Sequence, residues 1–88
     1  MNYQKIKMIK SKPKKNKLYY HHRYGIFRLV DIFKHPQKPD KNYNLVIKIL
    51  HHQYFEYVLS VQHWTPKKTH WDNFVREMTI DEYMVEML

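Results

Sequence analysis

Tyr43 to Trp64, which reads YNLVIKILHHQYFEYVLSVQHW, is the stretch that decides the fold. It contains no proline or glycine, and its odd-numbered residues from Leu45 to Val61 are apolar except at His51 and Gln53. Alternate side chains of a β-strand face opposite ways, so the odd residues predict one buried sheet face. The polar interruption predicts a reversal of the chain, and therefore a hairpin over about residues 44–63.

The predicted hairpin turns through His51, His52 and Gln53. A three-residue loop keeps the odd residues of both strands on the same face, whereas a two-residue turn would place Glu56 in the core. The opposed pairs in this register are Ile49 with Phe55, Ile47 with Tyr57, and Leu45 with Leu59.

A helix is the alternative interpretation of the same stretch, because polar residues recur every four positions from Lys48 to Ser60. The stretch is rich in Val, Ile, Tyr and Phe, and the whole chain lacks alanine. These are the residues that suit strands rather than helices, so we favour the hairpin.

Residues 18–34 precede the hairpin and are aromatic and β-branched. Their pattern suits either a strand or a short helix, and we favour a strand because the tyrosines at its start provide no helix cap. Gly25 predicts a bulge or a sharp bend, and residues 35–42, with two prolines, predict a polar loop to the hairpin.

Two short helices are predicted after Trp64. Thr69 is the expected cap of the first, and Thr79-Ile80-Asp81-Glu82 has the capping-box pattern that starts the second. One continuous helix would place the two apolar stripes on opposite sides, so we expect a break at Thr79.

The predicted fold is therefore α+β: a small, mostly antiparallel sheet of three to four strands, followed by two short C-terminal helices. We expect residues 1–17 to form a basic N-terminal arm that is partly flexible, and residues 18–88 to form a single small domain.

The formal net charge of the 88-residue chain is +8, and it is unevenly distributed. Up to Val30 there are seven lysines, two arginines and no acid, whereas from Thr69 onward there are five acids and one arginine. The two ends can partly neutralise each other, but the excess indicates a polyanionic partner.

Several function classes find no support in the sequence. There is no cysteine, no His-Glu-x-x-His spacing and no nucleophile elbow, so we predict neither a metal site, a cofactor nor catalytic residues. No apolar run is long enough to span a membrane, and the N-terminus does not have the pattern of a secretory signal. We expect an intracellular, cytoplasmic protein with no membrane contact.

Basic and aromatic residues alternate in the N-terminal half, and this pattern predicts the function. Cations neutralise phosphates, while Tyr, His and Arg faces stack on exposed bases. We therefore expect a small non-enzymatic protein that binds nucleic acid or a nucleoprotein complex. The candidate residues are Lys12, Lys14, Lys15, Lys17, Tyr19, Tyr20, His22, Arg23, Tyr24 and Arg28.

An alternative function comes from the even-numbered residues of the hairpin. One face of a small sheet is normally polar, yet four apolar residues fall on the even face: Val46, Leu50, Tyr54 and Val58. They predict a protein interface, either with a host protein that the chain inhibits or with a second copy in a homodimer. The composition, rich in Lys, Ile, Tyr and Asn, suits an AT-rich genome such as that of a phage or another mobile element.

A third alternative is a small ribonuclease toxin that uses His63 or a nearby lysine. Tyr57 to His63, after a strand that starts at Asn42, resembles the terminal hairpin of bacterial ribosome-dependent mRNA interferase toxins. That family places helices before its sheet, which this chain does not, and no catalytic residue is carried over.

Overall fold

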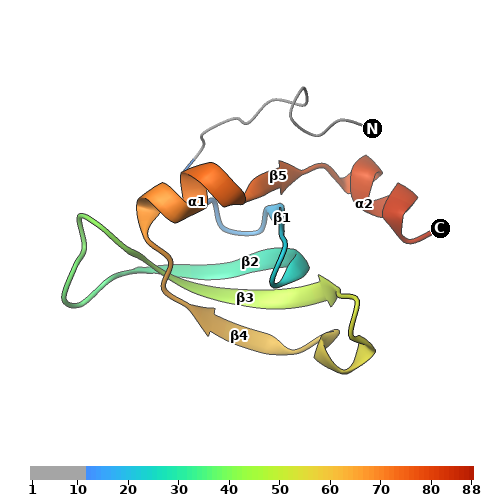
Figure 1. Ribbon diagram of the computed structural model, residues 1–88, viewed down its shortest axis with the longest axis horizontal. Coiled ribbons are helices and arrows are strands. Elements are labelled where there is room, and N and C mark those ends of the chain that lie inside the picture. The colour runs from blue at the N-terminus through green and yellow to red at the C-terminus, as the bar shows by residue number, and fades with distance from the viewer. Residues whose placement is uncertain (1–11) are drawn as a thin grey trace.

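A computed structural model describes residues 12–88 and has a five-stranded antiparallel sheet at its centre. The strands are β1 (Leu18–His21), β2 (Gly25–Lys34), β3 (Tyr43–His51), β4 (Val61–Trp64) and β5 (Arg76–Met78), in the spatial order β4-β3-β2-β1-β5 (Figure 1). The helices are α1 (Lys68–Phe74), α2 (Ile80–Glu86) and a 3-10 turn, η1 (Phe55–Tyr57).

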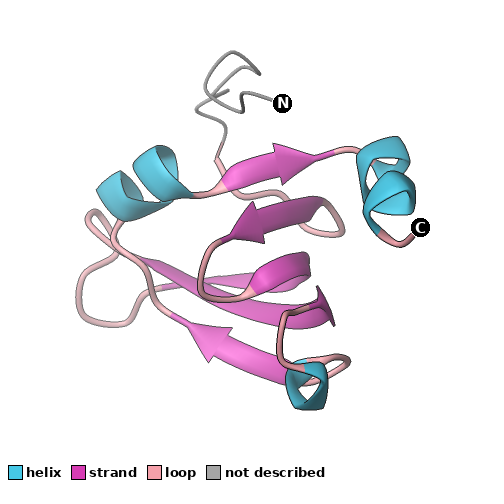
Figure 2. Cartoon of the chain, turned by 45° about the vertical axis from the view of Figure 1, so that its right-hand side comes forward, coloured by secondary structure: helices cyan, strands magenta, loops and turns pink. Residues whose placement is uncertain are grey.

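The α+β prediction is therefore confirmed, and the sheet has five strands where three to four were expected. Residues 18–34 form two strands instead of one, and β5, which was not predicted, separates α1 from α2 (Figure 2). At three residues it is too short to show an alternating pattern, and its pairing with β1 gives it strand structure.

One face of the sheet is buried beneath α1, and we call it the covered face. Its core consists of Tyr19, Phe27, Leu29, Leu45, Ile47 and Ile49, packed against Trp71 and Val75. The prediction that Leu45, Ile47 and Ile49 of β3 line the core is confirmed, since all three are at most 1% exposed. The opposite side of the sheet, called the open face here, carries the even residues of β3.

The predicted hairpin is present as β3 and β4, but its predicted turn and register were wrong. β3 and β4 pair with Leu45 opposite Trp64 and Ile47 opposite Gln62, after a wide loop that contains η1. Phe55, Tyr57 and Leu59, which were expected in the core, are 87%, 46% and 64% exposed.

The register follows from the packing of Trp64. Its ring lies 6.0 Å from Phe27, 6.1 Å from Trp71 and 4.9 Å from Tyr24, so the indole joins the core. The predicted register would have turned Trp64 to the open face, and a ring of this size contributes more by burial than Leu59 does.

Residues 18–34 form strands, as favoured. Gly25 lies at the sharp bend into β2 with a φ of 68°, which glycine adopts without strain. A Cβ at this position would overlap the carbonyl oxygen of His51. Two register shifts interrupt the pairing of β2 with β3, between Ile26 and Phe27 and between Leu29 and Asp31. The second shift places Ile32 beside Leu45 on the covered face.

The two predicted helix caps differ in outcome. Thr79 caps α2 in a complete capping box with Glu82, as predicted. The prediction for Thr69 was wrong, because α1 begins at Lys68 and its N-cap residue, Lys67, makes no side-chain cap bond. Main-chain contacts hold the start of α1 instead: Lys67 bridges to Asn42, and the Lys68 N–H donates to the Lys41 carbonyl.

The last part of the predicted arm is attached to β2. The Asn16 N–H donates to the Leu29 carbonyl at 2.7 Å, and the Leu29 N–H donates to the Lys17 carbonyl at 3.0 Å. The Lys14 N–H donates to the Tyr19 hydroxyl at 2.8 Å. Residues 1–11 of the arm lie outside the described part of the chain.

Candidate nucleic-acid interface

Two cations lie side by side at the centre of the open face. Arg28 of β2 stands directly opposite Lys48 of β3 in the strand register. Like charges in this position repel each other and destabilise the pairing of the strands. Within residues 12–88, neither cation forms an ion pair with a carboxylate. An anion bound between the two side chains would relieve this repulsion.

Apolar and aromatic side chains surround this cation pair. Val61 lies opposite Lys48, and Leu18 lies opposite Arg28, so one row crosses the face from β4 to β1. Tyr20 and Phe33 are 41% and 53% exposed. Their register partners, Ile26 for Tyr20 and Asn44 for Phe33, place both rings on the open face.

Two lysines from the attached segment lie at the edge of the open face. Lys15 lies 3.7 Å from Asp31, and Lys17 lies 3.4 Å from Glu77. Both pairs are solvent-exposed, and such pairs contribute at most about 1 kcal/mol. A polyanion can therefore displace these carboxylates at little cost, so the lysines extend the basic surface around Arg28.

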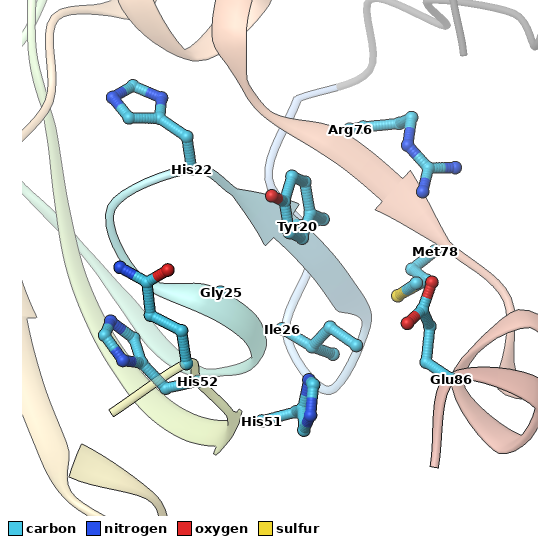
Figure 3. A pocket seen from close by; sticks show the side chains of 10 residues that line it. Tyr20, His22, Gly25, Ile26, His51, His52, Arg76, Met78 and Glu86 are labelled. Atoms are coloured by element: carbon cyan, nitrogen blue, oxygen red, sulfur yellow. The ribbon is translucent and has the colours of Figure 1, made fainter. Parts of the chain in front are cut away.

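A pocket of about 270 Å³ lies at the end of the open face where β1 turns into β2. Figure 3 shows Tyr20 inside it, between His22 on one side and Arg76 with Glu86 on the other. The lining also includes Ile26 and Met78, which are buried, and His51. The pocket thus combines apolar surface, an aromatic ring and three imidazoles, those of His22, His51 and His52.

Arg76 reaches this pocket but is held by α2. Its guanidinium donates to Glu82 at 2.9 Å, and the Arg76 side chain is only 10% exposed. The hydrogen bond from the Thr79 N–H, followed by the one from Arg76, lowers the pKa of the Glu82 carboxyl. Arg76 is therefore a structural cation whose charge is paired with Glu82.

The predicted nucleic-acid residues divide between three places. Tyr20, His22 and Arg28 lie on the open face or in its pocket, with Lys15 and Lys17 at the edge. Arg23 and Tyr24 line a different pocket, beside Ile49 of the covered face. Lys12 and Lys14 are exposed on the attached segment.

Tyr19 is excluded from the candidate nucleic-acid-binding residues. Its ring is 1% exposed and packs 4.8 Å from Trp71, so neither of its faces is open to a base. Burial raises the pKa of its hydroxyl, which accepts the hydrogen bond from Lys14. The tyrosine next along the strand faces the other way, as alternation requires.

Lys48 and His51 were missed by the prediction, which considered only the N-terminal half. Lys48 was identifiable, because it is the one lysine in the apolar run from Leu45 to Leu50 and has the parity of the open face. His51 reaches the pocket through its pairing with Ile26, and no local pattern shows this contact.

His21, which is buried, and His70, which is partly buried, form a pair with a structural role. The Arg23 N–H donates to His21 Nδ1 at 3.2 Å, so the His21 proton resides on Nε2, which donates to His70 Nε2 at 2.9 Å. Burial, followed by the charges of His22, His70 and Arg23, lowers the pKa of His21 to about 4. Both ring nitrogens of a neutral His21 are thus occupied.

The remaining described histidines give no metal centre. Residues 12–88 contain no group of three or more His, Asp or Glu side chains arranged to hold a metal ion. His52 donates from Nε2 to the Arg23 carbonyl and accepts at Nδ1 from the Tyr54 N–H. His63, the residue of the ribonuclease alternative, is bonded to Asn44.

The four residues predicted for a protein interface do not form one strand face. Val46 and Leu50 are partly buried on β3, whereas Tyr54 and Val58 belong to the loop before β4. The same loop exposes Phe55 and Leu59, and Leu59 has a φ of 67°. A bulky residue at positive φ costs about 1–3 kcal/mol and marks a constrained loop.

Comparisons with protein-family models, curated proteins and solved structures gave no match. No helix within residues 12–88 combines the length and apolar content that crossing a membrane requires.

Proposed function

We propose that this protein binds single-stranded nucleic acid across the open face of its sheet. The observation that supports this best is the pair of adjacent, unpaired cations, Arg28 and Lys48, on a face that also exposes aromatic rings. Two positive charges held next to each other without an acid are stabilised by a partner with closely repeated negative charges. A phosphate backbone is such a partner.

The shape of the surface favours a single strand over a duplex. Proteins read the major groove with a helix or a two-stranded ribbon that protrudes into it. The open face is instead a sheet surface with Tyr20 and Phe33 exposed on it. Unpaired bases can stack on such rings while their phosphates contact the cations. The pocket around Tyr20 offers one base a partly enclosed position.

Fluorescence anisotropy with a labelled single strand of about 12 nucleotides tests the proposal over a series of salt concentrations. The double variant Arg28→Gln/Lys48→Gln should flatten the logarithmic salt slope by about 1.4, since each single-strand contact contributes about 0.7. The matched control is Lys38→Gln/Lys41→Gln, which removes the same charge from the 35–42 loop. Equal flattening by the control would mean that only net charge matters, and no binding at low salt would reject the proposal.

A second test distinguishes stacking of a base on Tyr20 from general electrostatic attraction. Tyr20→Ala should weaken single-strand binding by roughly 1–3 kcal/mol and leave the salt slope unchanged, because a stacking ring carries no charge. Phe55→Ala removes an even more exposed ring that lines neither the Tyr20 pocket nor any other described pocket, and should have no such effect. Equal losses for both variants would contradict stacking at Tyr20.

Inhibition of another protein is a second candidate function, supported by the constrained loop that exposes Phe55 and Leu59. Co-purification with and without nuclease distinguishes the two functions. A stoichiometric protein that survives nuclease and is lost with Leu59→Ser would support inhibition. A second copy of the chain would instead give a dimer in light scattering, which Leu50→Glu should dissociate.

A further inference from the structure

A second pocket, of about 300 Å³, lies on the other side of the sheet from Arg28 and Lys48. It is lined by Arg23 and Tyr24 from the first turn, by Tyr54 and Tyr57 from the loop around η1, and by Ile49, His52 and Gln62. We call it the tyrosine pocket. Its volume is at the lower end of the range for small-molecule sites, roughly 300–1,000 Å³.

The aromatic walls of the tyrosine pocket stand at large angles to one another. Tyr54 and Tyr57 lie 6.3 Å apart at 78°, and His52 lies 5.2 Å from Tyr57 at 70°. The two bonds of His52, to the Arg23 carbonyl and from the Tyr54 N–H, fix this ring between the two loops. One tyrosine can thus stack on a planar ligand while another contacts its edge.

The polar groups of the pocket define the ligand further. The Arg23 guanidinium lies 5.3 Å from the centre of the Tyr24 ring, and no carboxylate within residues 12–88 pairs with it. The Gln62 side chain donates to Ser60 Oγ at 3.2 Å, which leaves its carbonyl oxygen and a second N–H for a ligand. Glu56, the acid of this loop, is not among the lining residues.

Aromatic pockets also bind quaternary ammonium ions, but the charge here opposes a cation. A cation–π contact at an exposed site contributes about 0.5–1 kcal/mol. Repulsion from a guanidinium at about 4 Å costs a similar amount even in water and more near a protein surface. An anionic group gains this energy instead, so the ligand is a planar ring with a negative charge.

We infer that the tyrosine pocket binds a nucleoside monophosphate, with the base against Tyr54 and Tyr57, its edge on Gln62, and the phosphate on Arg23. The same chemistry is present in a free nucleotide and in the phosphorylated end of a strand. This inference is independent of the proposed strand-binding face, because Arg28 and Lys48 do not line the tyrosine pocket.

The test uses AMP, adenosine, inorganic phosphate and tetramethylammonium as probes, with binding followed by amide chemical shifts in NMR spectra of the full chain. AMP should shift the amides of residues 23–24 and 54–62, and it should bind more tightly than adenosine or phosphate. No shift with about 10 mM AMP, a level that detects millimolar affinity, would overturn the inference. Tighter binding of tetramethylammonium than of AMP would also overturn it.

Variants assign the roles within the pocket. Arg23→Gln should weaken AMP roughly tenfold and leave adenosine unchanged, because only AMP has a phosphate. Tyr57→Ala should weaken both ligands roughly tenfold. The matched control Phe55→Ala removes a more exposed ring of the same loop that does not line the pocket, and should change neither affinity. The assignment would be contradicted if Arg23→Gln lowered the affinities for AMP and adenosine equally. It would also be contradicted if Phe55→Ala lowered either affinity as much as Tyr57→Ala does.

Two controls complete the design. Urea unfolding of each variant shows that the fold is retained, and Tyr57→Phe should rescue AMP binding if the ring rather than the hydroxyl is needed. Arg28→Gln/Lys48→Gln should leave AMP binding intact, so a failure of the strand-binding proposal is distinguishable from a failure of this one. In that double variant, tighter binding of a 5′-phosphorylated strand than of an unphosphorylated one would identify a strand end as the ligand, and equal binding would identify the free nucleotide.

Discussion

The two faces of the sheet differ in burial and in charge, although the same strands form both. On the covered face, Leu45, Ile47 and Ile49 of β3 are at most 1% exposed beneath Trp71. On the open face, Val46 and Lys48 of the same strand are only partly buried, and Lys48 meets Arg28 without an acid. Neighbouring residues of β3 thus have different roles. The odd-numbered residues 45–49 stabilise the fold, and the side chains between them remain accessible at the open face.

A small chain can combine stability with a charged surface when one face of its sheet supplies most of the core. A domain of this size buries about 60–65% of its unfolded surface, so its core depends on a few large side chains. Three aromatic rings are the largest side chains of this core, with Tyr19 and Phe27 in contact with Trp71. Because stability is concentrated on one face, the other can retain cations that repel each other.

The largest expected effect on stability comes from placing a charged side chain on the covered face. An apolar side chain on the open face is the comparison. Ile47→Lys should destabilise the protein by about 4 kcal/mol, because it buries an unpaired charge. Lys48→Ile, at the next residue, should change stability by less than about 0.5 kcal/mol or increase it. Urea unfolding of both variants checks this, and equal losses would mean that the faces are not distinct.

Acidification should lower the stability of the protein, because His21 on the covered face becomes protonated. Because its folded pKa of about 4 lies below the ordinary 6.5, the folded state binds this proton less readily than the unfolded state. Stability is therefore fully present above pH 6.5 and is lost as the pH falls towards 4. The loss should reach about 3 kcal/mol.

The measurement is the difference in unfolding free energy between the wild type and His21→Gln across this pH range, since carboxylates titrate in both proteins. His63→Gln, which alters an exposed histidine of the open face, is the matched control. If the wild type and His21→Gln lose stability in parallel, the His21 pair has no role in acid sensitivity.

An effect of about 1 kcal/mol is expected at the end of β5. Thr79→Ala removes the side chain that accepts from the Glu82 N–H at 3.1 Å, and should lower the unfolding free energy by this amount. Thr69→Ala, at the position where the structure has no cap, should have almost no effect. A larger loss for Thr69 than for Thr79 would reverse the two assignments.

The smallest expected effect measures the repulsion on the open face. Arg28→Gln should raise stability by up to about 0.5 kcal/mol at low salt, because it removes a like-charge pair. The gain should disappear at about 1 M salt, where the screening length is near 3 Å. A loss of stability at low salt would indicate that Arg28 has an attractive contact in the free protein.

Local sequence patterns were sufficient for much of this fold. The alternation in residues 45–49, the breaking residues in the 35–42 loop and the capping box at Thr79 each act within a few residues of the chain. They identified the α+β class, the buried face of β3 and the start of α2. The same parity indicated that Lys48 faces away from the core.

Long-range packing decided the rest. Phe55, Tyr57 and Leu59 competed with Trp64 for the covered face, and Trp64 lies there because it contacts Phe27 and Trp71, which are distant in sequence. Pairing with β1 created β5, and the β2–β3 register brought Arg28 beside Lys48. Period-two alternation shows which way a side chain points, but the energy of a contact depends on a partner from another strand. For that reason the register, the cation pair and both pockets emerged only with the folded sheet.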